Sequence, residues 1–241
     1  MKTTDRNNAS IISTTAKYIP AAVLGALLLF GGTNKASAAT VYSQTFTGGT
    51  GGLIDTTSTT GSGTWVGRDI ISQNGNTTGN WGSSSLAFTP TSGFIYELTA
   101  TINVTAANDS WLGVGFLQDN SNYGFFGTKT TPVALNRSGD WQVWAGPGAN
   151  YTKTSNDVLI RLDTTGAQWT TSVYQGGTQI GSTYTYTSGN PTINYVGFIS
   201  EGPAVGSVSA FQLTAVPEPS SFALVVGGIA NLLLIRRRVQ A

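Results

Sequence analysis

Apolar and polar residues alternate with a period of two through the central part of the chain. From Phe94 to Val104 every second residue is apolar, and most residues between them are polar, Glu97 among them. Residues 158–163 alternate in the same way. This is the period of a β-strand with one buried face. The pattern therefore predicts half-buried strands at 94–104 and 158–163.

Two adjacent glycines, Gly176 and Gly177, separate the runs 169–175 and 178–186. Glycines accept the positive φ of a two-residue hairpin turn, so these runs predict a hairpin. The stretch 48–80 has low complexity and few apolar residues, which predicts long loops. Further strands are predicted at 40–46, 84–88, 111–118, 123–128, 141–145, 193–200 and 207–213.

Many short strands joined by Gly, Asn and Ser turns predict an all-β fold, an antiparallel sandwich or barrel. Five segments follow one another in a characteristic order: WLGVGF at 111–116, VLIRLD at 158–163, the hairpin at 169–181, VGF at 196–198 and the strand at 208–213. Their order resembles the concanavalin A-like lectin and glucanase superfamily, in its laminin-G-like branch. That resemblance implies a jelly-roll β-sandwich over residues 39–215, with a last strand that pairs the C-terminal part back into the sheet.

At the C-terminus the alternation gives way to a proline-containing tripeptide, a charge-free run at 220–235 and a basic end. At ~1.5 Å per residue, a helix over this run is roughly 24 Å long. A hydrocarbon core is ~30 Å thick, so the sequence predicts a single transmembrane helix suited to temporary anchoring. The tripeptide is Pro217, Glu218 and Pro219, and the basic membrane stop is Arg236, Arg237 and Arg238.

These three parts, at 216–241, resemble the PEP-CTERM sorting signal of Gram-negative bacteria that make extracellular polysaccharide. The resemblance implies that a membrane transpeptidase-like enzyme, an exosortase, cuts near the tripeptide and passes the protein to the cell surface. An ordinary tail anchor is the alternative. The resemblance says nothing about the activity of the remaining chain.

The N-terminus has the layout of a Sec-type signal peptide over residues 1–38. Basic residues precede an apolar run at 19–30, and the small residues Ala36 and Ala38 form a cleavage site. The alternative is an uncleaved membrane helix, for which the run is too short. We expect the mature chain to begin near Ala39.

The amino-acid composition excludes several kinds of partner and catalytic mechanism. Acidic residues outnumber basic ones between 39 and 215, a balance that does not favour nucleic acid or anionic lipid as a partner. The chain has no cysteine and no histidine, which excludes disulfides, imidazole metal sites and Ser-His-Asp catalysis. Glycoside hydrolysis needs two acids, and neither Glu97 nor Glu201 has a second acid two or four residues away. We therefore expect no catalytic residue and no enzymatic activity.

A cluster of oxygen donors follows the predicted strand at 111–118. Calcium takes six to eight oxygen ligands, so Asp119, Asn120 and Asn122 are a candidate calcium loop. The same residue types make ordinary solvated turns, and we favour the turn. No other cofactor or metal is expected.

Aromatic side chains are the candidates for a glycan site. Trp141 and Trp144 lie three apart on a predicted strand and so point to opposite faces, while Tyr123 and Phe125 share a face. Aromatic rings most often fill the core, and we favour that interpretation. If the protein binds a glycan, Trp144, Tyr123 and Phe125 are where the sequence directs attention.

The sequence thus predicts an exported, surface-sorted β-sandwich without enzymatic activity, in an extracellular matrix, biofilm or envelope layer. Its expected partners are the Sec machinery, an exosortase and, transiently, the bacterial membrane. The alternative is a lectin-like module that binds exopolysaccharide. A glycoside hydrolase-like enzyme is a more remote alternative, and no nucleic acid partner is expected.

Overall fold

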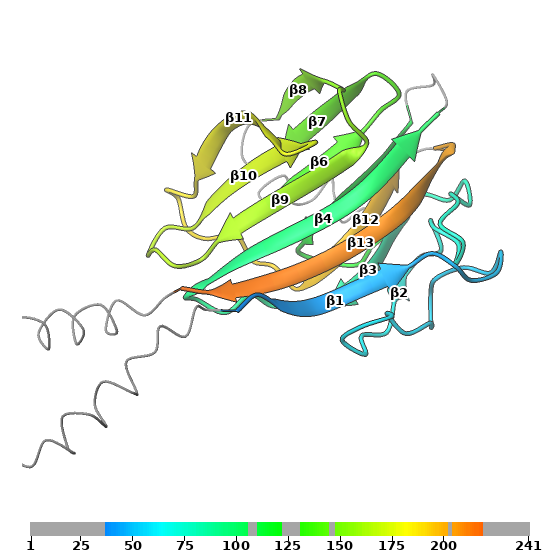
Figure 1. Cartoon of the computed structure of the whole chain (residues 1–241), viewed down its shortest axis with the longest axis horizontal. Coiled ribbons are helices and arrows are strands. Elements are labelled where there is room, and N and C mark those ends of the chain that lie inside the picture. The colour runs from blue at the N-terminus through cyan, green and yellow to red at the C-terminus, as the bar shows by residue number, and fades with distance from the viewer. Residues whose placement is uncertain (1–36, 106–109, 122–130, 145–147, 202–203, 219–241) are drawn as a thin grey trace, which may run out of the picture. The chain divides into compact units, whose positions relative to one another are not determined.

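In the computed structural model, residues 37–105, 110–121, 131–144, 148–201 and 204–218 are described, and they form an all-β fold without helices. Two antiparallel sheets pack face to face (Figure 1), as the sequence predicted for a β-sandwich. The chain crosses between the sheets repeatedly, so that β13 lies between β1 and β4, and β12 lies between β3 and β5. Such crossovers are those of a jelly roll.

The sheet at the front of Figure 1 has six strands in the order β1-β13-β4-β9-β10-β11, and the sheet behind it has seven in the order β2-β3-β12-β5-β6-β7-β8. The bounds of the six are β1 Ala39–Thr45, β13 Gly206–Pro217, β4 Phe94–Val104, β9 Asp157–Asp163, β10 Thr170–Gln175 and β11 Thr178–Thr185. The bounds of the seven are β2 Val66–Gly67, β3 Gly82–Ala87, β12 Tyr195–Glu201, β5 Trp111–Leu117, β6 Val133–Asn136, β7 Asp140–Trp144 and β8 Ala149–Thr152.

The predicted alternation is confirmed in the six-stranded sheet. In β4, Tyr96, Leu98 and Ala100 are buried, whereas Glu97 and Thr99 between them are half-buried and face outward. The loop-rich stretch before β3 supplies Trp65 to the core. Its ring stacks on Phe198 at 5.8 Å between centroids. The core is therefore made of apolar residues from both sheets and from the long loops.

The predicted Gly-Gly hairpin is also confirmed. Gly176 and Gly177 have φ values of 52° and 81°, as a primed two-residue turn requires, and they join β10 to β11. The strands β2, β6 and β8 were not predicted. The strand predicted at 123–128 lies outside the described residues.

The sandwich begins and ends on neighbouring strands. Ala39, the first residue of β1, pairs with Ala215 of β13, which continues to Pro217. The main-chain N–H of Glu218 donates to the carbonyl of Gly93 at 3.2 Å. Among the residues described, no helix is long and apolar enough to cross a membrane. Of the predicted signal peptide at 1–38 and the predicted sorting signal at 216–241, residues 1–36 and 219–241 lie outside the described residues.

Candidate functional site

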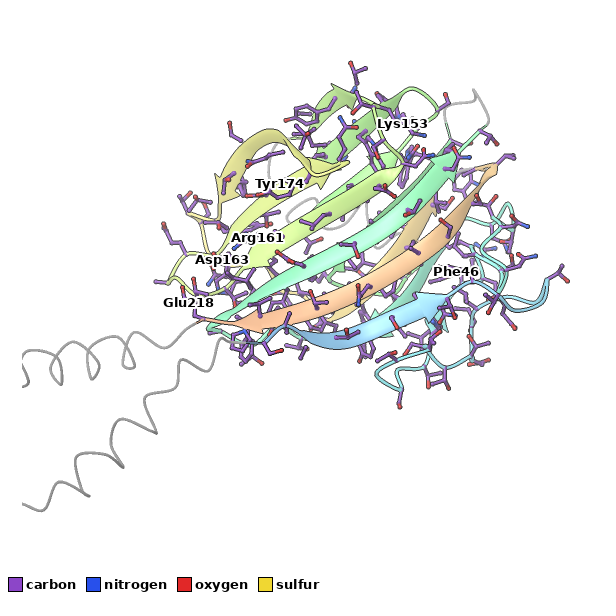
Figure 2. All side chains as sticks on the ribbon, in the orientation of Figure 1. Phe46, Lys153, Arg161, Asp163, Tyr174 and Glu218 are labelled. Carbon is purple, nitrogen blue, oxygen red and sulfur yellow. The ribbon has the colours of Figure 1, made fainter. Side chains whose placement is uncertain are left out.

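A groove of about 430 Å³ lies on the outer face of the six-stranded sheet, which faces the viewer in Figure 2. Its floor comes from the middle strands β4, β9 and β10, and its two ends from the glycine turn and from β13. The volume lies in the lower part of the range of ligand sites, and the groove is largely open to solvent. The outward side chains that line it are Glu97, Thr99, Thr101, Asp157, Leu159, Arg161, Tyr174 and Ala210.

Strand register sets the position of each of these side chains. Glu97 of β4 pairs with Arg161 of β9. Thr99 of β4 pairs with Leu159, which pairs in turn with Tyr174 of β10. Because directly opposed residues on one face lie about 5 Å apart, these side chains form continuous rows across the strands.

The groove carries one cation and two carboxylates. The Thr101 hydroxyl donates to Asp157 Oδ1 at 2.6 Å, and the main-chain N–H of Asp157 donates to Ser155 Oγ at 3.0 Å. Arg161 is the register partner of Glu97, and Asp157 lies four residues before Arg161 on the same strand. The positions of Glu97 and Asp157 are therefore about 13 Å apart along the strands. The two acids of the groove therefore do not face each other.

The acid nearest to Glu97 in register is Asp163, which pairs with Ile95 and so lies diagonally across from Glu97. Its Oδ1 accepts bonds from the main-chain N–H of Thr165 at 3.0 Å and from the Thr165 hydroxyl at 2.6 Å. These bonds tie Asp163 into the turn after β9, and Asp163 does not line the groove. Glu201, the other glutamate considered from the sequence, pairs with Trp111 through its backbone.

The outer face of the seven-stranded sheet is apolar and buried where it is formed by β5, β6 and β12. Trp141 is fully buried between the sheets, and Trp144 is half-buried on the opposite face, as their spacing predicted. Trp144 is therefore on a different sheet from the groove. It packs against a second apolar cluster, made of Trp111, Leu117, Val133, Leu135 and Ile199, together with Tyr195.

Glycines in β5 leave room for the side chains of this second apolar cluster to pack directly on the β5 backbone. A Cβ placed on Gly115 would lie 2.6 Å from Val133 Cγ2 and 2.7 Å from the carbonyl oxygen of Pro132. On Gly113 it would lie 2.5 Å from Leu135 Cδ2. The neighbouring strand β6 thus occupies the space that a side chain would need.

Asp119 makes the contacts of a turn. Its Oδ1 accepts bonds from the main-chain N–H and the hydroxyl of Ser121, at 2.9 and 2.7 Å. This is the arrangement that the turn interpretation predicts for the candidate calcium loop. Over the described ranges, no group of three or more acidic residues is placed to hold a metal ion. Asn120 is described, and Asn122 is not.

The remaining predicted site residues are only partly placed. Ala38 is exposed just before β1, Pro217 is the last residue of β13, and Glu218 is exposed after it. The others lie outside the described residues: Tyr123, Phe125, Ala36, Pro219, Arg236, Arg237 and Arg238.

The sequence interpretation missed Arg161 and Tyr174 as groove residues. Both occupy outward positions of strands that were predicted correctly, β9 and β10. The signal was available in principle, because a charged or aromatic residue stands where an alternating strand faces solvent. What the sequence lacked was the pairing of β9 with both β4 and β10, which brings these positions together.

No protein-family model matches the chain, and no curated protein matches it. Among solved structures, it is similar to an endo-1,3-β-glucanase from Streptomyces sioyaensis, with 14% identity, a TM-score of 0.49, and coverage of 75% of this chain and 97% of that chain. It is also similar to human galectin-16, with 10% identity, a TM-score of 0.33, and coverage of 54% and 92%. A CBM2 module from phage J-1 of Lactobacillus casei BL23 gives 12% identity, a TM-score of 0.37, and coverage of 76% and 98%. Similarity this distant assigns no activity to this chain.

Proposed function

We propose that this protein is an exported, surface-sorted bacterial β-sandwich that acts by contact and not by catalysis. The observation that carries the proposal is that the groove holds no facing pair of acids. Glu97 faces Arg161, and Asp157, the other carboxylate of the groove, is about 13 Å away along the strands. Asp163 lies nearer, diagonally across from Glu97, but it is hydrogen-bonded to Thr165 and does not line the groove. Glycosidases hold their two carboxylates roughly 5 to 10 Å apart on either side of the scissile bond. With no histidine in the chain, carboxylates are the groups left for acid and base work.

The enzymatic alternative is tested by turnover. The full chain, kept in mild detergent, is incubated with soluble neutral β-glucans, and new reducing ends are counted. We expect no release above the level of a protein-free blank. Any hydrolysis by the wild-type chain would contradict the contact function, and hydrolysis that both Glu97→Gln and Asp163→Asn abolish would show that these two diagonal acids work as a pair.

The ends of the sandwich support the export and sorting part of the proposal. A signal-peptidase cut after Ala38 would remove no residue of β1, which begins at Ala39. A cut after Pro219 would leave β13 whole and would keep the Glu218 main-chain bond to Gly93. Both processing steps are thus compatible with an intact sandwich.

The sorting part has its own experiment. Glu218→Gln keeps the main-chain bond, so any defect reports on recognition of the side chain and not on folding. We expect this variant, and one lacking Arg236 to Arg238, to accumulate unprocessed in the membrane fraction on immunoblots. Normal processing of both variants would contradict the sorting assignment.

A lectin-like role is the second candidate, and the groove on the exposed sheet favours it over a purely structural role. Its lining combines an aromatic ring, Tyr174, with hydrogen-bonding side chains such as Arg161 and Asp157. That mixture is typical of sites that fix a polar ligand on an apolar floor.

A further inference from the structure

We propose that the groove on the outer face of the six-stranded sheet binds a neutral, β-linked polysaccharide chain that lies across the strands. The inference rests on the proposed contact function and adds to it a site, a ligand class and an orientation. All of the groove's lining residues belong to paired strands or to the turn between β10 and β11. The site is therefore built on rigid elements.

The lining side chains form three parallel rows, each running perpendicular to the strands. The middle row is the most apolar, and polar rows flank it on both sides. Successive rows are two residues apart along each strand, or about 6.7 Å. The rows are Glu97 with Arg161, then Thr99 with Leu159 and Tyr174, then Thr101 with Asp157.

This order of rows matches the two surfaces of a flat sugar ring. A β-linked pyranose presents C–H groups on its faces and hydroxyls around its edge. The faces can pack on Leu159 and on the ring of Tyr174, since aromatic rings offer a large flat apolar surface. The edge hydroxyls then reach Arg161 on one side and Asp157 on the other, where donors and acceptors are both present.

The direction of the chain follows from the order of the rows. The middle row crosses β4, β9 and β10, whereas Ala210 of β13 pairs with Thr101 and so belongs to the last row. Neighbouring strands lie about 4.8 Å apart, so the middle row is roughly 10 Å long. An extended β-linked chain can follow this straight row, whereas a coiled α-linked chain would leave it.

The charges favour an uncharged ligand. A polyanion would meet the carboxylates of Glu97 and Asp157, and a polycation would meet the guanidinium of Arg161. A polyol suffers neither repulsion, because each hydroxyl both donates and accepts. An extended peptide could not add as a strand here, because β4, β9 and β10 are each paired on both sides.

The test is binding of neutral hexasaccharides to the full chain in mild detergent, measured by isothermal titration calorimetry. The probes are β-1,4-linked hexamers of glucose, mannose, xylose and N-acetylglucosamine, with α-linked maltohexaose and a uronic acid hexamer for comparison. At least one β-linked neutral probe should bind, and Tyr174→Ala should weaken it about tenfold, as expected for a lost aromatic contact. Tyr174→Phe keeps the ring and should lose much less.

Trp81→Ala is the matched control, since Trp81 is 47% exposed and does not line the groove. Circular dichroism verifies that each variant is folded. The groove assignment is overturned if no β-linked neutral probe binds, if the α-linked or uronic acid probe binds more tightly, or if folded Tyr174→Ala binds normally. Shortening of the bound probe would contradict the contact function instead, so the two proposals fail separately.

Discussion

The outer faces of the two sheets differ in how far their residues are exposed to solvent. On the six-stranded sheet, outward residues such as Glu97, Leu159 and Arg161 are half-buried and line a groove. On the seven-stranded sheet, outward residues such as Leu135 and Ile199 are almost completely buried. The first surface is therefore available for contact with a ligand, and the second contributes to stability.

This difference follows from the sequences of the strands. β4 and β9 alternate between apolar and polar residues, as strands do in a sheet with one buried and one solvent-exposed face. All seven residues of β5 are buried, and so are all four of β6. A strand that is buried on both faces does not need polar residues at every second position, so its sequence shows no alternation.

The largest expected effect contrasts one leucine from each outer face. Leu135→Ala should lower the free energy of unfolding by about 2–5 kcal/mol, because Leu135 is 0% exposed and its loss leaves a cavity. Leu159→Ala, on the exposed sheet, should cost less than about 1 kcal/mol. Urea denaturation followed by tryptophan fluorescence gives both values. Equal losses in the two variants would show that the faces do not differ in the way described here.

A methyl group added to the buried outer face of the seven-stranded sheet should lower the free energy of unfolding by somewhat less than Leu135→Ala does. Gly115→Ala places a Cβ against Val133 and the carbonyl of Pro132, and we expect a loss of about 1–3 kcal/mol from overpacking. Gly139→Ala is the control, in the turn between β6 and β7, since its Cβ meets nothing within 4 Å. Urea midpoints measure both changes. If the two variants were equally stable, β5 and β6 could not approach as closely as the structure has them.

The smallest expected effect concerns a tyrosine beneath the exposed sheet. Burial raises the pKa of Tyr186 above its ordinary value of 10.0, and its hydroxyl lies 3.2 Å from Thr171 Oγ1. Tyr186→Phe removes that hydrogen bond and should cost about 1 kcal/mol at neutral pH.

The pH dependence of that cost has a definite sign. Above pH 10 the unfolded tyrosine ionises while the folded one stays protonated, so the stability of the wild type falls as pH rises. The variant lacks this loss, and the difference in unfolding free energy between the two proteins should narrow from pH 10 upward. Urea melts from pH 8 to 11 measure it, and a constant difference would contradict the raised pKa.

Much of the fold could be predicted from the sequence where strands alternate or a turn has a clear signal. β4, β9 and the hairpin at Gly176 and Gly177 are examples. The short strands β6 and β8 were missed, because four residues are too few to establish a period. Trp144 was recognised as facing away from Trp141, which is where the structure has it.

The groove could not be predicted, because it depends on pairing between distant segments. Glu97 and Arg161 are opposite each other only because β4 and β9 are neighbours, and Leu159 meets Tyr174 only through the pairing of β9 with β10. Apart from the hairpin at Gly176 and Gly177, the sequence carries no local signal that tells which of these strands are neighbours. The sequence drew attention to Trp144, which lies on the other sheet.

The central claim is that the exposed six-stranded face makes contact with a ligand and leaves it chemically unchanged. The most direct measurement is a leucine methyl NMR spectrum of the full chain in detergent, recorded with and without the β-linked hexasaccharide that binds best. We predict that the methyl signals of Leu159 shift, that those of Leu135 do not, and that the saccharide keeps its length. Shifts at Leu135 with Leu159 unchanged, or cleavage of the saccharide in the tube, would contradict the account.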